Sequence, residues 1–202
     1  MLTGAVLPDT TLEGRAALAI GVVERAYLRA LESLCGAATP LELVCDCPEC
    51  GQMLEFQITT RAIWSVSAGR AVPDNVIVSH KGRKFEISMP TLGVVGANGL
   101  DLVALAPDAP WDDPEFRATV EDALSEADPL LGPEMALQCA ACGHEFSLPV
   151  DLAALLWQQV ANTARPLMQE VIRLSRALGW SEQDILAMPA ARRRLYLSEL
   201  GA

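Results

Sequence analysis

Four of the six cysteines form two C-x2-C pairs, each followed directly by glycine: Cys47-Pro48-Glu49-Cys50-Gly51 and Cys139-Ala140-Ala141-Cys142-Gly143. Two thiolates from one tight turn can reach the same metal ion, and the glycine can supply the positive φ that closes the turn. Backbone N–H groups of such a turn can also point at the sulfurs. A doubled C-x2-C-G step is typical of zinc knuckles. We therefore predict that Cys47, Cys50, Cys139 and Cys142 bind one Zn²⁺.

Disulfide bonds and redox chemistry are the alternatives for these cysteines. Residues 1–10 contain no basic n-region, and the apolar run at 16–23 is short and flanked by charges, so no signal peptide is predicted. We therefore expect a cytosolic setting, which favours metal binding over disulfides. A thioredoxin-type pair would open a helix after a strand, whereas both pairs here are followed by strand patterns.

Three further residues near the predicted site are not counted as ligands. Cys45 could compete for the metal, but we interpret it as a small buried or partly exposed thiol. Cys35 ends a helix-like stretch and is interpreted as a core residue. His144 follows the second pair, and we expect it to lie beside the site or face solvent, because four thiolates complete a tetrahedral set.

Strand-like segments flank both cysteine pairs. Residues 41–44 and 54–58 enclose the first pair, and residues 135–138 and 145–148 enclose the second. The predicted fold class is therefore α+β: a zinc ribbon of two β-hairpins split by a long insert, flanked by N-terminal and C-terminal helices. The segments are an N-terminal helical segment (1–38), the ribbon (39–58 plus 135–150), the insert with a β-hairpin and an acidic helix (59–134) and a C-terminal helical region (151–202).

The N-terminal segment has apolar residues at three- and four-residue spacing, which predicts one helix over 12–34. Thr10 or Thr11 can cap its start, and Gly36 can end it. Gly14 and Gly21 lie inside this helix, and each should weaken it by about 1 kcal/mol relative to alanine.

The insert is predicted to contain a β-hairpin at 76–87, with a turn at Lys81-Gly82. A short helix is predicted around 101–106, and an acidic helix at about 115–127. Between the hairpin and the short helix lies a loop with three glycines, whose spacing matches neither a P-loop nor a dinucleotide-binding motif.

The C-terminal region is predicted to be helical. Asp151 is a suitable N-cap for a helix that continues to Leu178, with Pro166 expected to kink or split it. Two short helices follow, the second beginning at Pro189. The apolar side chains of this tail exceed what two short helices can bury. We favour folding back onto the long helix over a free docking surface.

Composition limits the partners. The 202 residues are 51% hydrophobic and 20% charged, with a net charge of −11 at pH 7. No apolar stretch approaches the roughly eighteen residues of a membrane span. Residues 101–134 hold ten acidic residues and one basic residue. Because nucleic-acid binding needs a basic face, we expect a protein partner, and neither nucleic acid nor a membrane.

Catalytic constellations are not evident in the sequence. The only two histidines, His80 and His144, lie in predicted turns, and no nucleophile lies beside a base. A metal saturated by four thiolates has no open position for water. A zinc deaminase would need a His-x-Glu motif, whereas His144 and Glu145 are adjacent. We therefore predict that the protein is not an enzyme.

The stretch LQCAACGHEFSLPVDLAALLWQQV, followed by VIRLSRALGWSEQDILAMPAARRRLYLSEL, resembles the baseplate hub assembly proteins of T4-like phages. Relatives of those proteins occur in contractile tails and tail-like injection systems. The shared features are the two knuckles with a long insert, Asp128-Pro129, Trp157 and the tail from Gly179-Trp180 to Tyr196-Leu197. The similarity spans about residues 40–202, although the second knuckle lacks the usual proline and Cys45 is extra.

This resemblance implies a role in assembling the central hub or baseplate, as an assembly factor or minor structural component, with hub or tail proteins as partners. It implies a location in the bacterial cytoplasm or in the baseplate itself. The alternative is a zinc-ribbon regulatory protein that binds nucleic acid, and the oligomeric state stays open. On the C-terminal tail, the candidate partner-binding residues are Trp180, Ile185, Leu186, Arg193 and Tyr196.

Overall fold

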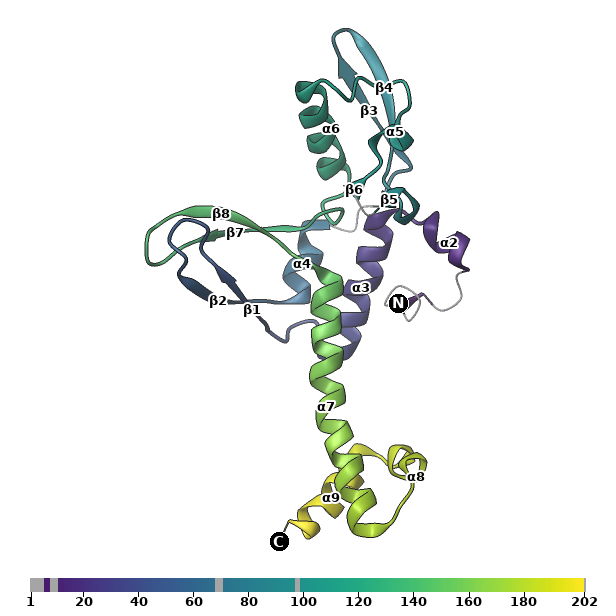
Figure 1. Ribbon diagram of the computed structural model, residues 1–202, viewed down its shortest axis with the longest axis vertical. Coiled ribbons are helices and arrows are strands. Elements are labelled where there is room, and N and C mark those ends of the chain that lie inside the picture. The colour runs from purple at the N-terminus through teal and green to yellow at the C-terminus, as the bar shows by residue number, and fades with distance from the viewer. Residues whose placement is uncertain (1–5, 8–10, 68–70, 97–98, 202) are drawn as a thin grey trace. The chain divides into compact units, whose positions relative to one another are not determined.

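The computed structural model describes residues 6–7, 11–67, 71–96 and 99–201. Contacts divide the chain into two compact units, Met1–Leu156 and Trp157–Ala202, each with its own elements. Figure 1 shows the helices and strands along the chain. Among the described residues, no helix combines the length and the apolar character needed to cross a membrane.

Residues 11–38 form two helices, α2 (Leu12–Ala16) and α3 (Ile20–Cys35), so the prediction of one helix over 12–34 is wrong. A continuous helix would bond the Ile20 N–H to Ala16, four residues earlier. Instead this N–H donates to the Pro90 carbonyl at 2.9 Å. The helical ends agree with the prediction, because the Thr11 hydroxyl accepts from the backbone N–H of Gly14 and Gly36 adopts a φ of 89°. Thr10 lies outside the described residues.

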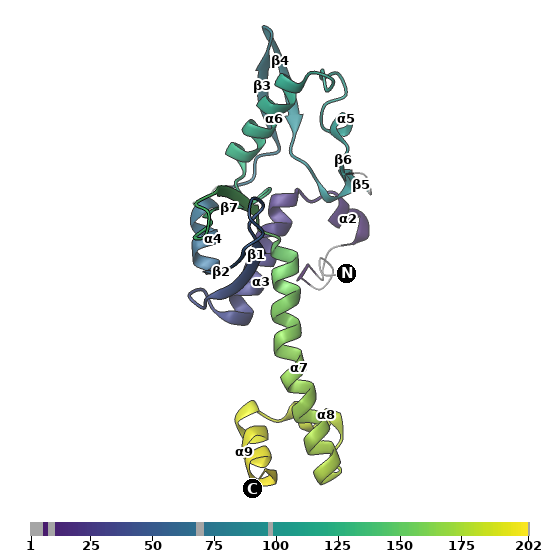
Figure 2. The same cartoon turned by 60° about the vertical axis from the view of Figure 1, so that its left-hand side comes forward.

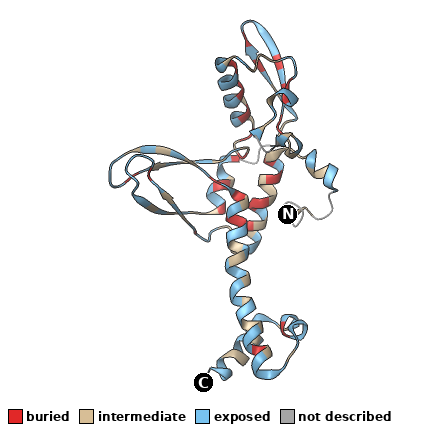
Figure 3. Cartoon of the chain, in the orientation of Figure 1, coloured by how far each residue is buried: buried red, intermediate tan, exposed pale blue. Residues whose placement is uncertain are grey.

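The first core of the larger unit packs one face of α3 against α4 (Thr60–Ser67) and the first turn of α7 (Leu152–Leu178). Its fully buried members include Leu28, Leu31 and Leu152, and buried positions on these helices are red in Figure 3. Asp151 caps α7, since its Oδ1 accepts from the Ala154 N–H at 2.8 Å. Helix α4 has no counterpart among the elements expected from the sequence.

The second core lies in the insert. The predicted hairpin is present as β3 (Asn75–His80) and β4 (Arg83–Ser88), and its turn places Lys81 and Gly82 at φ 47° and 77°. Helix α6 (Pro114–Ala127) packs along β3, as both views show (Figures 1 and 2). The remaining elements are the 3₁₀ helix η1 (Leu92–Val94), strands β5 (Val95–Gly96) and β6 (Gly99–Leu100), and helix α5 (Leu102–Leu105).

Phe116 is the centre of the insert core. It is fully buried on α6, and the rings of His80, Phe85 and Trp111 each meet it edge-on at 5.1–5.4 Å. His80 was expected in a turn, but it is the last residue of β3 and is buried. Its Nε2 lies 3.0 Å from Asp113 Oδ2, which also accepts from Lys81 at 2.6 Å. These contacts, that of Lys81 first, hold the pKa of Asp113 below its usual range.

An ion pair joins α3 to the end of α6. The Arg25 guanidinium binds both carboxylate oxygens of Asp128 at 2.8 and 2.9 Å, and Asp128 is fully buried. A Cβ on Gly21 would lie 1.6 Å from Asp128 Oδ2. Gly21 lowers the helix propensity of α3, but the Asp128 carboxylate lies so close to it that no residue with a β-carbon fits at this position.

The smaller unit consists of the rest of α7 with α8 (Glu182–Ala187) and α9 (Ala190–Leu200). The prediction at Pro166 was a kink or a split, and the split is wrong because helix α7 continues through Pro166. Pro166 and Asn162 are both exposed. Pro166 removes the backbone hydrogen bond to the Asn162 carbonyl, and it does so at an exposed part of the helix.

The C-terminal tail folds back onto α7. Arg193 Nε on α9 donates to Glu170 Oε2 on α7 at 3.0 Å, and Leu174 and Ile185 are both fully buried. Trp180 and Tyr196 pack edge to face at 4.8 Å between ring centroids. Of the five candidate partner-binding residues, Leu186 is the exposed one. Their role in binding a partner stays a prediction.

Candidate metal centre

Two antiparallel hairpins carry the cysteine pairs at their turns, so the expected α+β fold with split, ribbon-like hairpins is confirmed. Strand β1 (Leu41–Asp46) pairs with β2 (Met53–Ile58), and β7 (Glu134–Gln138) pairs with β8 (Glu145–Pro149). Burial alternates along all four strands, as expected for hairpins with one face turned inward. The turns of the two hairpins lie on the same side in Figure 1.

The two turns have the same hydrogen-bond pattern. Gly51 N–H donates to the Cys47 carbonyl at 2.9 Å, and Gly143 N–H donates to the Cys139 carbonyl at 2.8 Å. Gly51 and Gly143 have φ values of 69° and 76°, which confirms the expected left-handed conformation at both positions. A β-carbon would be strained in this conformation, so both turns depend on glycine.

The four sulfurs of Cys47, Cys50, Cys139 and Cys142 lie within 4.8 Å of one another. The Sγ atoms of Cys47 and Cys142 are 3.7 Å apart, as are those of Cys50 and Cys139. Sulfurs about 2.3 Å from a tetrahedral zinc would be separated by about 3.8 Å, whereas a disulfide needs about 2.05 Å. Both of these contacts run between the two hairpins, at a separation that suits a shared metal ion.

Backbone N–H groups point at the sulfurs, as expected for knuckle turns. The N–H of Cys142, supported by that of Ala141, lowers the pKa of the Cys139 thiol to about 7. For Cys142 the N–H of His144 acts in the same direction, but desolvation and the neighbouring sulfurs outweigh it and raise the pKa to about 12. Four thiols this close can all ionise only if a cation offsets their repulsion.

Cys45, Cys35 and His144 lie outside the four-sulfur cluster. Cys45 is half-buried in β1 opposite Leu54, and Cys35 is half-buried at the end of α3. His144 is half-buried and stacks on Phe146, with 6.1 Å between ring centroids. Its contribution is through the backbone, because its carbonyl accepts from the Cys139 N–H at 2.9 Å.

Sequence reasoning identified the four sulfurs and singled out His144, but it missed Gln52 and the backbone role of both residues. Gln52 and His144 occupy equivalent positions, and their carbonyls accept from the N–H groups of Cys47 and Cys139. The N–H of Gln52 also acts on the Cys50 sulfur, as that of His144 does on Cys142. The signal was available, because both residues are the second after the last cysteine of their pair.

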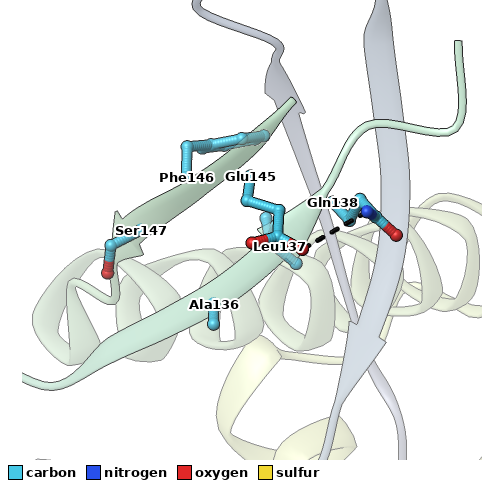
Figure 4. Close-up of a pocket in the computed structure, with 6 residues that line it drawn as sticks. All are labelled: Ala136, Leu137, Gln138, Glu145, Phe146 and Ser147. Atoms are coloured by element: carbon cyan, nitrogen blue, oxygen red, sulfur yellow. Dashed lines mark hydrogen bonds between the residues drawn. The ribbon is translucent and has the colours of Figure 1, made fainter. Parts of the chain in front are cut away.

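A cavity of about 510 Å³ lies along the hairpin of β7 and β8 (Figure 4). Leu137 and Phe146 give it apolar walls, and its one carboxylate, Glu145, accepts a hydrogen bond from the Gln138 side chain at 3.3 Å. The six lining residues therefore present a mixed surface for contact, without a pair of titratable side chains for proton transfer.

Comparison of the chain with protein-family models, with curated proteins and with solved structures found no match in any of the three.

Proposed function

We propose that the chain is a non-catalytic, zinc-stabilised protein that takes part in assembling the baseplate or hub of a contractile tail or tail-like injection system. Zinc binding is supported by one observation: four thiols from two hairpins form a cluster, with sulfur separations of 3.7 Å between the hairpins. All-sulfur tetrahedral sites of this kind are typical of structural zinc. The baseplate role is supported by the sequence resemblance over about residues 40–202.

The donor set favours a structural over a catalytic metal. Catalytic zinc sites keep one position for water or substrate, whereas four thiolates fill all four positions of a tetrahedron. Each hairpin supplies two sulfurs, so the metal joins segments of the chain that lie 89 and 95 positions apart. In this role zinc supplies binding free energy that becomes folding free energy.

The first experiment separates the metal from the assembly role. Purified protein should contain about one zinc per chain by elemental analysis, since the two pairs form one tetrahedral set. A stoichiometry far from one, or unchanged melting in a strong chelator, would contradict the structural zinc and leave the baseplate role to be tested separately.

The second experiment tests the role in the host system. Deleting the gene should leave sheath and tube proteins expressed, while particles are absent or lack baseplates. Replacing Trp180 and Tyr196 together by alanine removes the 4.8 Å ring contact and should give a partial defect with the zinc retained. Normal contractile particles from the deletion strain would refute the assembly role.

The regulatory alternative predicts a different result. A zinc-ribbon protein that reads nucleic acid must bind it at low salt and release it as salt rises. The basic cluster at 192–194 is its most favourable feature, but Arg193 is paired with Glu170 and Arg192 lies over the Tyr196 ring. Filter binding at low salt distinguishes the two functions, because the assembly role predicts no retention of DNA or RNA.

A further inference from the structure

The segment of α7 that opens the smaller unit is unusually apolar for an exposed helix surface. Residues 157–169 contain a single charge, that of Arg165. Trp157 and Met168 are 61% and 63% exposed, the highest values among the large apolar residues of α7. An exposed apolar stripe of this kind marks an interaction surface more often than a solvated face.

The stripe has an internal symmetry. Trp157, Ala161, Ala164 and Met168 are spaced four, three and four residues apart, so they share one face of the helix. The large residues are at the two ends and the small ones are in the middle. The same arrangement is obtained when the helix is turned end over end about a point between Asn162 and Thr163.

We infer that this face pairs with the same face of a second copy of the chain, with the two α7 helices antiparallel. A two-fold axis between Asn162 and Thr163 places each Trp157 beside the second copy's Met168, and each Ala161 beside the second copy's Ala164. The alanines allow the helix backbones to approach, and the indole and thioether make a favourable sulfur–aromatic contact. A partner with a different sequence would not require this symmetry.

Charge also favours a second copy. The larger unit carries 22 of the 26 acidic residues but only 9 of the 15 basic ones, giving a net −13, whereas the smaller unit is +2. Electrostatic repulsion between two copies is therefore smallest when they associate through the smaller unit.

The size of the interface is at the low end for specific pairs of proteins. It is about 1,000 Å² in total when two copies bury the side chains of Trp157, Val160, Met168 and Ile172.

Sedimentation of the zinc-loaded full chain tests the pairing, from micromolar to several hundred micromolar protein. The wild type should pass from monomer to dimer across this range. Trp157→Lys and Met168→Glu should each weaken association at least about tenfold. Each substitution removes a large apolar side chain from both copies, and therefore two buried side chains from every dimer. Leu195→Glu is the matched control, since Leu195 is 67% exposed on α9 of the same unit and should leave the dimer unchanged.

Mixing the Trp157→Lys and Met168→Glu variants tests the orientation. In an antiparallel pair the lysine introduced into one variant faces the glutamate introduced into the other, while the native contact is kept on the opposite side, so the mixture should dimerise again. In a parallel pair residue 157 faces residue 157, and mixing restores nothing. A wild type that stays monomeric, variants that associate like the wild type, or a mixture that stays monomeric would each overturn the proposal. Zinc content and circular dichroism check that every variant is folded.

Discussion

The thiols of the metal centre differ from one another although their spacing in sequence is the same. Backbone N–H groups lower the pKa of Cys139 to about 7, whereas at Cys142 the N–H of His144 is outweighed by desolvation and the neighbouring sulfurs, which raise the pKa to about 12. Cys139 is therefore ionised more readily than Cys142 at neutral pH, and a divalent cation favours ionisation of the cluster by reversing the local repulsion. Metal binding should release protons as a result.

Substitution at single cysteines should separate ligands from bystanders. Cys139→Ser should lose the metal, because a hydroxyl replaces a thiolate in a four-sulfur set. Cys45→Ser is the matched control: Cys45 is two residues from Cys47 but lies outside the cluster, and it should keep the metal. Elemental analysis and thermal melting give the answer. Retention of zinc by Cys139→Ser together with loss by Cys45→Ser would mean that the ligand set is wrong.

Glu24 gives the protein a dependence on pH that is separate from the metal. Desolvation, and then the charge of Asp151, raise its pKa from 4.5 to about 7. The folded protein therefore holds the proton more tightly than the unfolded chain, and stability falls as pH rises from about 4.5 to 7. Glu24→Gln should remove this fall and stabilise the protein at pH 8 by about 1 kcal/mol, allowing for partial exposure.

The measurement is urea unfolding of the zinc-loaded protein at several pH values. Glu42→Gln on strand β1 serves as control because Glu42 is exposed. Equal pH dependence in the wild type and in Glu24→Gln would contradict the assignment of this effect to Glu24.

Among the elements, α3 and α6 are joined by one buried ion pair that depends on a glycine. A bidentate guanidinium–carboxylate pair is strong only if both partners keep their geometry, and removing one partner leaves a buried charge. Gly21 lies where any β-carbon would enter the carboxylate of Asp128. The contact between the two helices therefore depends on three residues rather than two.

Gly21→Ala should destabilise the protein by about 2–4 kcal/mol, although alanine is the better helix former by about 1 kcal/mol. Gly132→Ala should be nearly neutral, because no atom lies within 4 Å of a β-carbon at that position. In an Asp128→Ala background, Gly21→Ala should cost far less, since the clashing carboxylate is gone. Additive costs in this double-mutant cycle, measured by denaturant unfolding, would refute the clash.

Elements with strong local patterns could be predicted from sequence. Each of the four ribbon strands has an apolar residue at every second position, and the Lys81-Gly82 turn carries its own hairpin signal. The four sulfurs could be predicted because ligand spacing within a knuckle is local. That the two knuckles come together in one four-sulfur cluster could be expected from their matching form.

Elements that depend on distant contacts could not be predicted in this way. Helix α4 is short and contains residues with low helix propensity, and it is held by the burial of Ile63 and by the Trp64 indole, which donates to Glu32. The break before α3 follows from pairing with the segment at 90–92. The partners Arg25 and Asp128 are 103 positions apart in the sequence. The one local signal for their contact is Gly21, because a glycine inside a helix can mark a place where another segment packs closely against it.

The whole chain is strongly acidic, and most of its acidic residues lie in the larger unit. Its net charge of −13, against +2 for the smaller unit, repels phosphate chains at any distance within the screening length. Partners that meet the larger unit should therefore be basic or apolar protein surfaces, whereas the smaller unit can approach another protein without a charge barrier.

Replacing Arg192 and Arg194 by glutamine should leave nucleic-acid retention at its background level in low salt, because the wild type itself is expected to show none. The same variant should keep the fold, since Arg193, which pairs with Glu170, is unchanged. Filter binding and thermal melting measure the two effects. Strong retention by the wild type that falls in the variant would favour the regulatory function over assembly.

The distance between the two knuckles also imposes an order in time. A ribosome adds about 5–20 residues per second, so the second pair of sulfurs is made several seconds after the first, 89 positions further along the chain. During that interval the first hairpin can offer only two thiolates to a metal, while the insert core around Phe116 already has all its residues. We expect newly made chains to fold the insert first, and to remain exposed to oxidation at Cys47 and Cys50 until synthesis passes Cys142.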